Sequence, residues 1–379
     1  MLANAPTLPL GALPMSANSF KNSRLLHVDA LKAFAAQLIV LHHLSAYGPV
    51  ANAVHALAPQ LMAGLYQYGR MAVQVFLVVG GFLSARALSA RGQMLEGGVA
   101  GLLWRRYLRL SLPFMAAVLL TLACSGLVAR WLPELVPHSV SAAQLMAHGL
   151  LLHGVLGQES LTVGAWYVAM DFQLFAVLLG LLWLARHARL PRAVQRVIGP
   201  ALVLVLALAS LFVFNRIAAL DAWAPYFFAA YGLGALVHWL GLSPHRRLGL
   251  ALLSVVVIVA LLFDFRERIA LALLTALLLA ALQRRHQAGQ PLLMAGRRAA
   301  TVAHLGTQSY SLFLVHFPIC LLVNALFADY ELSNGWAGVV ALLMAWGLSN
   351  LAALPFYRWV EAPAGRVRLG WLLPRPLRA

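Results

Sequence analysis

Residues 104–130 read WRRYLRLSLPFMAAVLLTLACSGLVAR, and this stretch decides the class of fold. Three arginines come first, and no charged residue then occurs from Leu110 to Ala129. A helix needs about 20 apolar residues to cross a hydrocarbon core of about 30 Å. The stretch therefore predicts a transmembrane helix with a basic end at one membrane surface.

Apolar runs of this kind recur along the chain. Of its 379 residues, 62% are hydrophobic and only 10% are charged, which is typical of proteins whose solvent is the bilayer. The sequence therefore predicts an all-α, polytopic membrane protein with about ten transmembrane helices. The runs fall at approximately 28–48, 68–88, 110–130, 165–185, 198–216, 224–241, 248–263, 268–282, 306–327 and 337–357.

The basic residues indicate the orientation. The chain has 28 Lys and Arg against 11 Asp and Glu, a net charge of +17, which could also indicate nucleic-acid binding. The bases, however, stand between apolar runs and concentrate in every second loop, as expected on the cytoplasmic side of a membrane. This pattern argues against a nucleic-acid partner and places both termini in the cytoplasm. The predicted outer loops lie near 50–66, 131–164, 217–223, 264–267 and 328–336.

One apolar segment, residues 141–157, does not fit the alternation. It reads SAAQLMAHGLLLHGVLG, is short, and contains His148 and His153. If it crossed the membrane, every later loop would invert against the charge rule. We therefore expect a re-entrant or outer-surface helix here.

A single membrane domain accounts for residues 25–363. Residues 1–24 lack the apolar core of a signal peptide and are predicted to form a flexible cytoplasmic tail, and residues 364–379 a basic cytoplasmic tail. Cys124 and Cys320 lie in separate apolar runs without metal-ligand spacing. The sequence therefore predicts neither a disulfide nor a metal site.

The first apolar run is unusually rich in ionisable residues, namely Asp29, Lys32, His42 and His43. Such residues inside a membrane span are functional candidates. At about 100° per residue, His43 falls within about 20° of Lys32, whereas His42 lies about 80° away. Lys32 and His43 are separated by about 16 Å along the axis, so one helix face carries a cation near the cytoplasm and a base in the outer half. A neutral histidine can accept a proton at physiological pH; the alternative is a hydrogen-bonded packing histidine.

The arginines of residues 104–113 form a second group. Arg105 and Arg109 are one helical turn apart, and Arg106 lies between them. Guanidinium groups bind phosphate in a bidentate manner, which suits a nucleotide-bearing donor. Anchoring at the cytoplasmic surface is the alternative explanation.

Two further groups lie in later runs. Trp166, Asp171 and Gln173 stand at the outer start of one run, where an acid could orient a base or hold a hydroxylated substrate. Tyr310 and His316 interrupt the run SYSLFLVHFPI at residues 309–319. An interfacial aromatic belt and a packing histidine are the alternatives.

These groups, in this order, resemble the acyltransferase 3 family of bacterial membrane proteins, which includes glycan O-acetyltransferases. The resemblance runs from about Leu26 to Pro363. It rests on the ten-residue interval between Lys32 and His43, on GRMAVQVFLVVGGFL at 69–83, on WRRYLRLSLP, on residues 166–175, on SYSLFLVHFP and on YRWVEAP. The family usually has Arg at the position of Lys32, an acid at Gln74, Ser at Gly80 and Glu at Asp171.

The resemblance implies an O-acyltransferase of the bacterial inner membrane. The donor would be acyl-CoA, as a rule acetyl-CoA, bound as a co-substrate from the cytoplasm, and the acceptor a hydroxyl of a cell-surface glycan or glycolipid precursor. Because many members carry a soluble esterase-like domain after the last span, any second transfer step here would need a separate periplasmic partner. We expect catalytic roles for His43, Asp29 and Asp171, donor binding by Lys32, Arg105, Arg106 and Arg109, and substrate binding by His42, Trp166, Gln173, Tyr310 and His316.

Two other classes of function also fit a polytopic chain with intramembrane charges. One is a transporter or exporter of a glycan or lipid-linked precursor, although the inverted repeat typical of carriers is not visible. The other is a structural or sensory membrane protein. Saturable acetyl-CoA binding would count against both.

Overall fold

The computed structural model describes residues 25–90, 95, 98–188, 191–290, 296–332 and 334–367, and every regular element in them is helical. The predicted tail at 1–24 lies outside the described residues, as does most of the predicted tail at 364–379. The helices are α2 (Leu26–Ala46), α3 (Gly48–Leu57), α4 (Pro59–Gly69), α5 (Ala72–Leu88), α6 (Val99–Val128), α7 (Ala142–Gly149), α8 (Ala165–His187), α9 (Arg192–Phe212), α10 (Ala224–Leu240), α11 (Arg246–Phe263), α12 (Glu267–Gln287), α13 (Gly296–Thr307), α14 (Ser309–Asp329), α15 (Gly335–Phe356) and α16 (Ala362–Ala364), with a π-helical turn at Tyr357–Glu361.

The predicted fold class is confirmed. Each of the ten apolar runs forms a helix, and eight helical segments of the described chain are long and apolar enough to cross a membrane. The two remaining runs are α2, which carries the polar residues discussed above, and α10, which has only 17 residues. Residues 50–66 form most of the helices α3 and α4 rather than a loop, with Pro59 starting the second helix.

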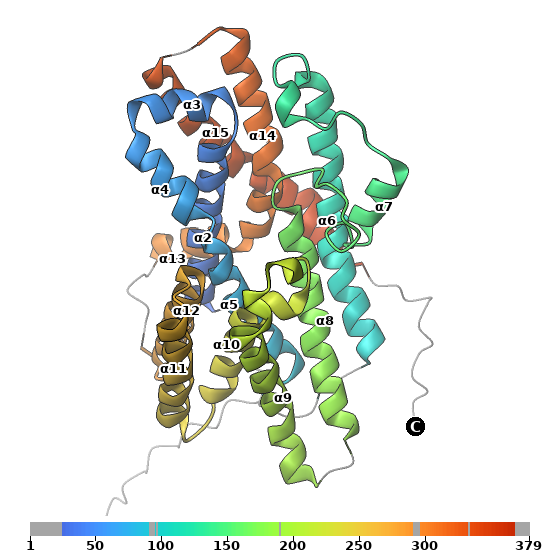
Figure 1. Cartoon of the computed structure of the whole chain (residues 1–379), viewed down its shortest axis with the longest axis vertical. Helices are drawn as coiled ribbons and strands as arrows, with labels where there is room; N and C mark the ends of the chain where they lie inside the picture. Colours follow the sequence, from blue (N-terminus) through green and yellow to red (C-terminus); the bar gives the residue numbers. More distant parts are fainter. Residues whose placement is uncertain are drawn as a thin grey trace, which may run out of the picture.

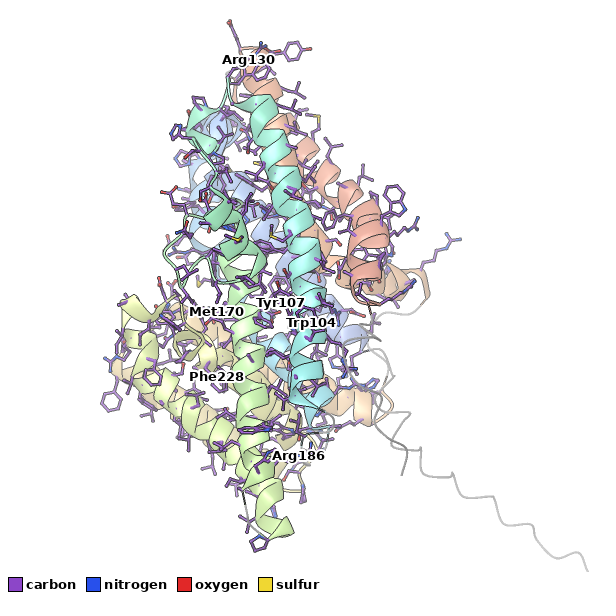
Figure 2. All side chains as sticks on the ribbon, turned by 90° about the vertical axis from the view of Figure 1, so that its right-hand side faces the viewer. Trp104, Tyr107, Arg130, Met170, Arg186 and Phe228 are labelled. Atoms are coloured by element: carbon purple, nitrogen blue, oxygen red, sulfur yellow. The ribbon has the colours of Figure 1, made fainter. Side chains whose placement is uncertain are left out.

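The helices form two groups that meet near mid-height of the molecule (Figure 1). The upper group contains α2, α3, α4, α14 and α15, and the lower group contains α8 to α12. The long helix α6 runs beside both groups, as the turned view also shows, with Trp104 and Tyr107 near the middle of the molecule (Figure 2). A site at this junction can therefore be lined by helices of both groups.

Helices α5 and α10 approach each other closely because glycines face backbone. A Cβ atom at Gly81 would lie 1.8 Å from the carbonyl oxygen of Tyr231, and one at Gly234 would lie 1.9 Å from the carbonyl oxygen of Val78. Side chains are thus excluded at both points of contact, as in other small-residue helix interfaces of membranes. This contact fixes the position of Gly80, which borders the site described below.

The segment 141–157 contains no helix long enough to span a membrane, which agrees with the prediction. Its only helix, α7, has eight residues and is therefore about 12 Å long. The carbonyl oxygen of Gly149 at its end accepts hydrogen bonds from Tyr107 Oη at 2.8 Å and Ser111 Oγ at 2.7 Å. These bonds hold α7 against the side of α6 (Figure 2).

Candidate active site

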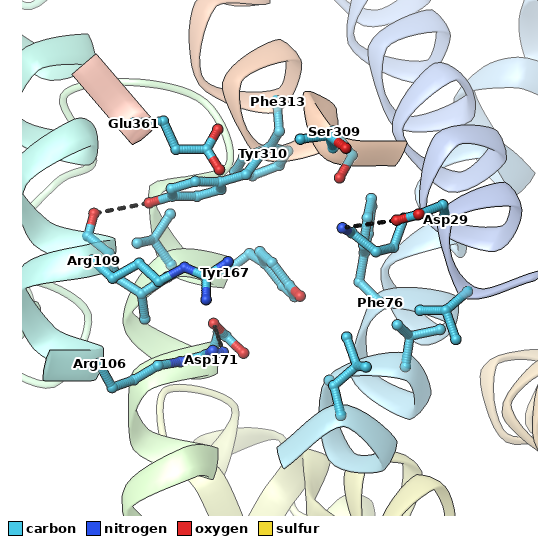
Figure 3. A pocket seen from close by; sticks show the side chains of 18 of the residues that line it. Asp29, Phe76, Arg106, Arg109, Tyr167, Asp171, Ser309, Tyr310, Phe313 and Glu361 are labelled. Atoms are coloured by element: carbon cyan, nitrogen blue, oxygen red, sulfur yellow. Dashed lines mark hydrogen bonds and ion pairs between the residues drawn. The ribbon is translucent and has the colours of Figure 1, made fainter. Parts of the chain in front are cut away.

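Two cavities lie on either side of a thin wall within the described chain. The first, here named the arginine cavity, has a volume of about 720 Å³ (Figure 3). Its polar lining comes from α2, α5, α6, α8, α13, α14 and the π-helical turn, and includes Asp29, Lys32, Arg86, Arg106, Arg109, Tyr167, Asp171, Tyr310 and Glu361. The second, the histidine cavity, has a volume of about 570 Å³. Its polar lining includes His42, His43, Tyr47, Arg70, Ser125, Glu134, Gln144, Glu159, Thr162, Trp166 and Tyr167.

The wall between the cavities consists of Tyr167 and Phe313, which line both. Their rings meet nearly edge to face, with centroids 5.7 Å apart and planes inclined by 71°. Gly164, at φ +76°, makes room for the Phe313 ring, because a Cβ there would lie 2.5 Å from the ring carbon Cζ. The separation between the cavities is therefore one layer of aromatic side chains.

Helix α2 borders both cavities. Lys32, near its start, lines the arginine cavity, and His43, near its end, lines the histidine cavity. The structure therefore places the predicted cation near one end of this helix and the predicted base near the other. One helix thus presents the cation Lys32 to the arginine cavity and the base His43 to the histidine cavity.

Two of the cations in the arginine cavity are paired with carboxylates. Arg106 donates to Asp171 Oδ2 at 2.5 Å, and its guanidinium lies 5.2 Å from the centroid of the Phe175 ring. Nζ of Lys32 lies 3.9 Å from Oδ1 of Asp29, which is one turn earlier in α2. The structure thus places both predicted catalytic acids, Asp29 and Asp171, in the arginine cavity beside cations and not beside His43.

The remaining polar groups of this cavity differ in their partners. Arg109 has no carboxylate within ion-pair distance in the described part of the chain, and its side chain extends into the cavity (Figure 3). Tyr310 donates to the carbonyl oxygen of Leu110 at 2.9 Å, and Ser311 donates to Glu361 at 2.5 Å. Arg105, by contrast, donates to the carbonyl of Gly101 and is not part of the lining.

The partner of His43 is His316. Nδ1 of His43 lies 2.8 Å from Nε2 of His316, and Nδ1 of His316 lies 2.6 Å from the carbonyl oxygen of Phe313. His316 is fully buried, whereas His43 lines the histidine cavity. His316, expected to bind substrate, therefore lies behind His43 and not in the lining of either cavity.

Of the other residues expected to bind substrate, two line the histidine cavity. The His42 ring lies beside Tyr66, with Nδ1 3.3 Å from the Leu65 carbonyl, and Trp166 stacks on Phe227 with 40% of its surface exposed. Gln173 lines neither cavity, because its amide bonds to the backbone of Ala222 and Ala224.

The segment after α6 supplies one wall of the histidine cavity and depends on two buried histidines. His148 Nδ1 lies 2.8 Å from the Gln144 carbonyl, and its Nε2 accepts from the Leu161 amide at 3.1 Å, while the His153 ring stacks on it at 4.2 Å. Burial lowers the pKa of His148, and burial together with the neighbouring His148 lowers the pKa of His153 to about 4. Both rings are therefore neutral at physiological pH.

Sequence reasoning did not select several of the lining residues. Arg86 and Glu361 are charges within or beside an apolar run, so the rule that flagged Lys32 could have found them. Tyr167 and Phe313 carry no such signal, because aromatic residues are common in membrane helices. No group of three His, Cys, Asp or Glu gathers as metal ligands within the described residues.

The family model for the acyltransferase domain of the acyltransferase 3 family matches residues 25–354. The match begins at the start of α2 and ends within α15, so it contains every residue of the wall and of the histidine cavity. No curated protein and no solved structure matches the chain.

Proposed function

Because the chain belongs to the acyltransferase 3 family of membrane acyltransferases, we propose that it moves an acyl group from acyl-CoA in the arginine cavity to a hydroxyl group in the histidine cavity. The main support for the proposal is that α2 presents Lys32 to the arginine cavity and His43 to the histidine cavity. Tyr167 and Phe313 form the wall between these two cavities. A donor and an acceptor could thus meet at the wall without sharing a chamber.

The arginine cavity suits the donor because its cations outnumber its acids. Lys32, Arg86, Arg106 and Arg109 face Asp29, Asp171 and Glu361. CoA carries several phosphate charges, which guanidinium groups bind well. The volume of about 720 Å³ lies within the usual range for small-molecule sites. On the orientation predicted from the loop charges, this cavity borders the cytoplasmic end of α2.

The histidine cavity suits a hydroxylated acceptor. Its lining offers the base His43, amide and hydroxyl groups from Gln144 and Thr162, and the partly exposed ring of Trp166. Carbohydrates present hydroxyls at their edges and C–H groups on their faces, so an aromatic ring among hydrogen-bonding groups matches them. A glycan or glycolipid precursor is therefore our proposed acceptor, and acetyl our proposed acyl group.

The reaction proceeds in two proton steps. His43 takes the proton of the acceptor hydroxyl as the oxygen attacks the thioester carbon, and the C–S bond then breaks. The imidazolium returns the proton to the CoA thiolate, so an ester and free CoA are the products. The hydroxyl of Tyr167, which points into the arginine cavity at the wall (Figure 3), is placed to donate to the carbonyl oxygen as negative charge develops.

The decisive experiment compares acetyl-CoA binding and acetyl transfer in detergent-purified wild type and His43→Ala. We expect binding to remain and transfer to fall by about 10²- to 10⁴-fold, the usual contribution of a general base. His55→Ala, an exposed histidine outside both cavities, is the matched control. Failure of the wild type to bind acetyl-CoA would refute the donor assignment and favour a carrier.

A further inference from the structure

We propose that His316 is a positioning residue that holds His43 in the tautomer with a bare Nε2, which is the form that can act as a base. This inference rests on the proposed function for its catalytic meaning, but its structural part stands on hydrogen-bond geometry. A carbonyl oxygen can only accept a hydrogen bond.

The carbonyl of Phe313 fixes the proton of His316. Because Nδ1 of His316 lies 2.6 Å from this oxygen, Nδ1 must carry the hydrogen. A neutral imidazole has one protonated nitrogen, so Nε2 of His316 is then an acceptor. The two residues are three positions apart on α14, so this step is set within one helix.

The bare Nε2 of His316 in turn fixes the proton of His43. Nδ1 of His43 lies 2.8 Å away and must donate, which leaves Nε2 of His43 without a proton. The ring planes differ by only 12° and the centroids are 4.8 Å apart. The separation of 2.8 Å between the two nitrogens is that of a hydrogen bond.

The opposite direction of this hydrogen bond would require a positive charge on His316. His316 could donate to His43 only if it carried protons on both nitrogens, and it is fully buried. An unpaired charge in such a position is strongly unfavourable. His43 has the more accessible position, since its ring lines the histidine cavity, so a proton taken from the acceptor stays on His43.

The hydrogen bond between His43 and His316 is kept before and after proton transfer. When Nε2 of His43 accepts a proton, Nδ1 still donates to His316, and the bond strengthens because its donor is now charged. In serine proteases a carboxylate holds the histidine tautomer in this way. Here a neutral ring backed by a carbonyl does so, without a second charge inside the protein.

The tautomer is tested by nitrogen NMR on the full chain labelled with ¹⁵N-histidine. The difference between the spectra of wild type and His43→Ala isolates His43, and we expect its Nδ1 protonated and its Nε2 bare at neutral pH. In His316→Leu we expect this pattern to be lost, and in His316→Gln, whose side-chain oxygen can replace the acceptor, to be retained. A bare Nδ1 in the wild type, or an unchanged pattern in His316→Leu, would overturn the inference.

Kinetics test the consequence, with acetyl-CoA as donor and methyl glucoside as a hydroxyl probe. His316→Leu should lower kcat by roughly 10- to 100-fold, as misplaced catalytic groups commonly do, with the KM for acetyl-CoA unchanged, and His316→Gln should recover most of the loss. A loss of folded protein in the leucine variant would leave the glutamine variant and the wild-type spectrum as the test. If His43→Ala transferred normally while the tautomer pattern held, the proposed function would fail and the histidine pairing would stand.

Discussion

The ring centroids of Tyr167 and Phe313 lie 5.7 Å apart. Together the two rings form the wall between the arginine cavity and the histidine cavity. On the proposed function, their position would keep the thioester of the donor and its acceptor apart until they react. An enzyme of this kind must exclude water from the thioester, and the wall is the structural candidate for that task.

A smaller side chain in the wall should let water compete with the acceptor for the acetyl group of acetyl-CoA. Phe313→Leu removes part of the ring that separates the cavities, so we expect acetyl-CoA hydrolysis to rise by about tenfold relative to transfer. The ratio of free acetate to acetylated product measures this. Tyr167→Phe keeps both rings and should leave the ratio near that of the wild type; equal ratios in all three proteins would remove the wall from the mechanism.

Donor binding should depend on Arg109 and not on Arg105. Arg109 lines the arginine cavity, whereas Arg105 lies outside the lining and donates to the carbonyl of Gly101. We expect Arg109→Gln to weaken acetyl-CoA binding by about tenfold at low salt and less at high salt, because salt screens the phosphate contact. Arg105→Gln is the control. Calorimetric titrations giving the same dissociation constant for both variants would contradict the assignment.

Loss of one member of the Arg106–Asp171 pair should mainly lower stability. Either Arg106→Met or Asp171→Leu leaves a charge in a largely buried position and should cost roughly 3 kcal/mol. The double variant removes both charges and should recover much of that loss. Melting temperatures in detergent provide the comparison, and simple additivity of the two single variants would show that the pair is not coupled.

The wall of the histidine cavity around α7 should loosen in acid. Because the pKa of His153 is about 4 in the folded protein and about 6.5 in an unfolded chain, the unfolded state binds more protons between these values. Stability of this segment therefore falls as the pH drops from about 6.5 toward 4, by roughly 3 kcal/mol at most. Hydrogen exchange of residues 141–164 reports it. His153→Phe should flatten the profile, and a profile as steep as that of the wild type would exclude His153 as its source.

The close contact of α5 and α10 should not tolerate a methyl group. Gly81→Ala places a Cβ against the backbone of Tyr231, so the helices must separate, at a cost of about 3 kcal/mol or more. Melting temperature and the yield of monodisperse protein measure this. Gly180→Ala on α8 meets no atom within 4 Å and should be neutral or slightly stabilising; similar losses in both would point to an effect of helix chemistry and not of packing.

The sequence by itself determined the fold class and the placement of Lys32 and His43 on one helix. Apolar runs long enough to cross a bilayer predicted the helices because hydrophobic length is a local property. The 3.6-residue period placed Lys32 and His43 on one face of α2, and the structure agrees, because two residues on one helix need no tertiary information to be related. The 8-residue α7 was likewise excluded as a span by the charges around it.

Tertiary structure alone decided which groups meet. That His43 pairs with His316, and that Asp171 pairs with Arg106, depends on contacts across 273 and 65 positions of sequence. Helical periodicity relates residues within one helix but carries no information on the neighbouring helix or its rotation. For the same reason the sequence did not reveal the wall of Tyr167 and Phe313. Each is an ordinary aromatic residue in its own helix, and only the contact of the two rings, one from α8 and one from α14, makes them a boundary between two cavities.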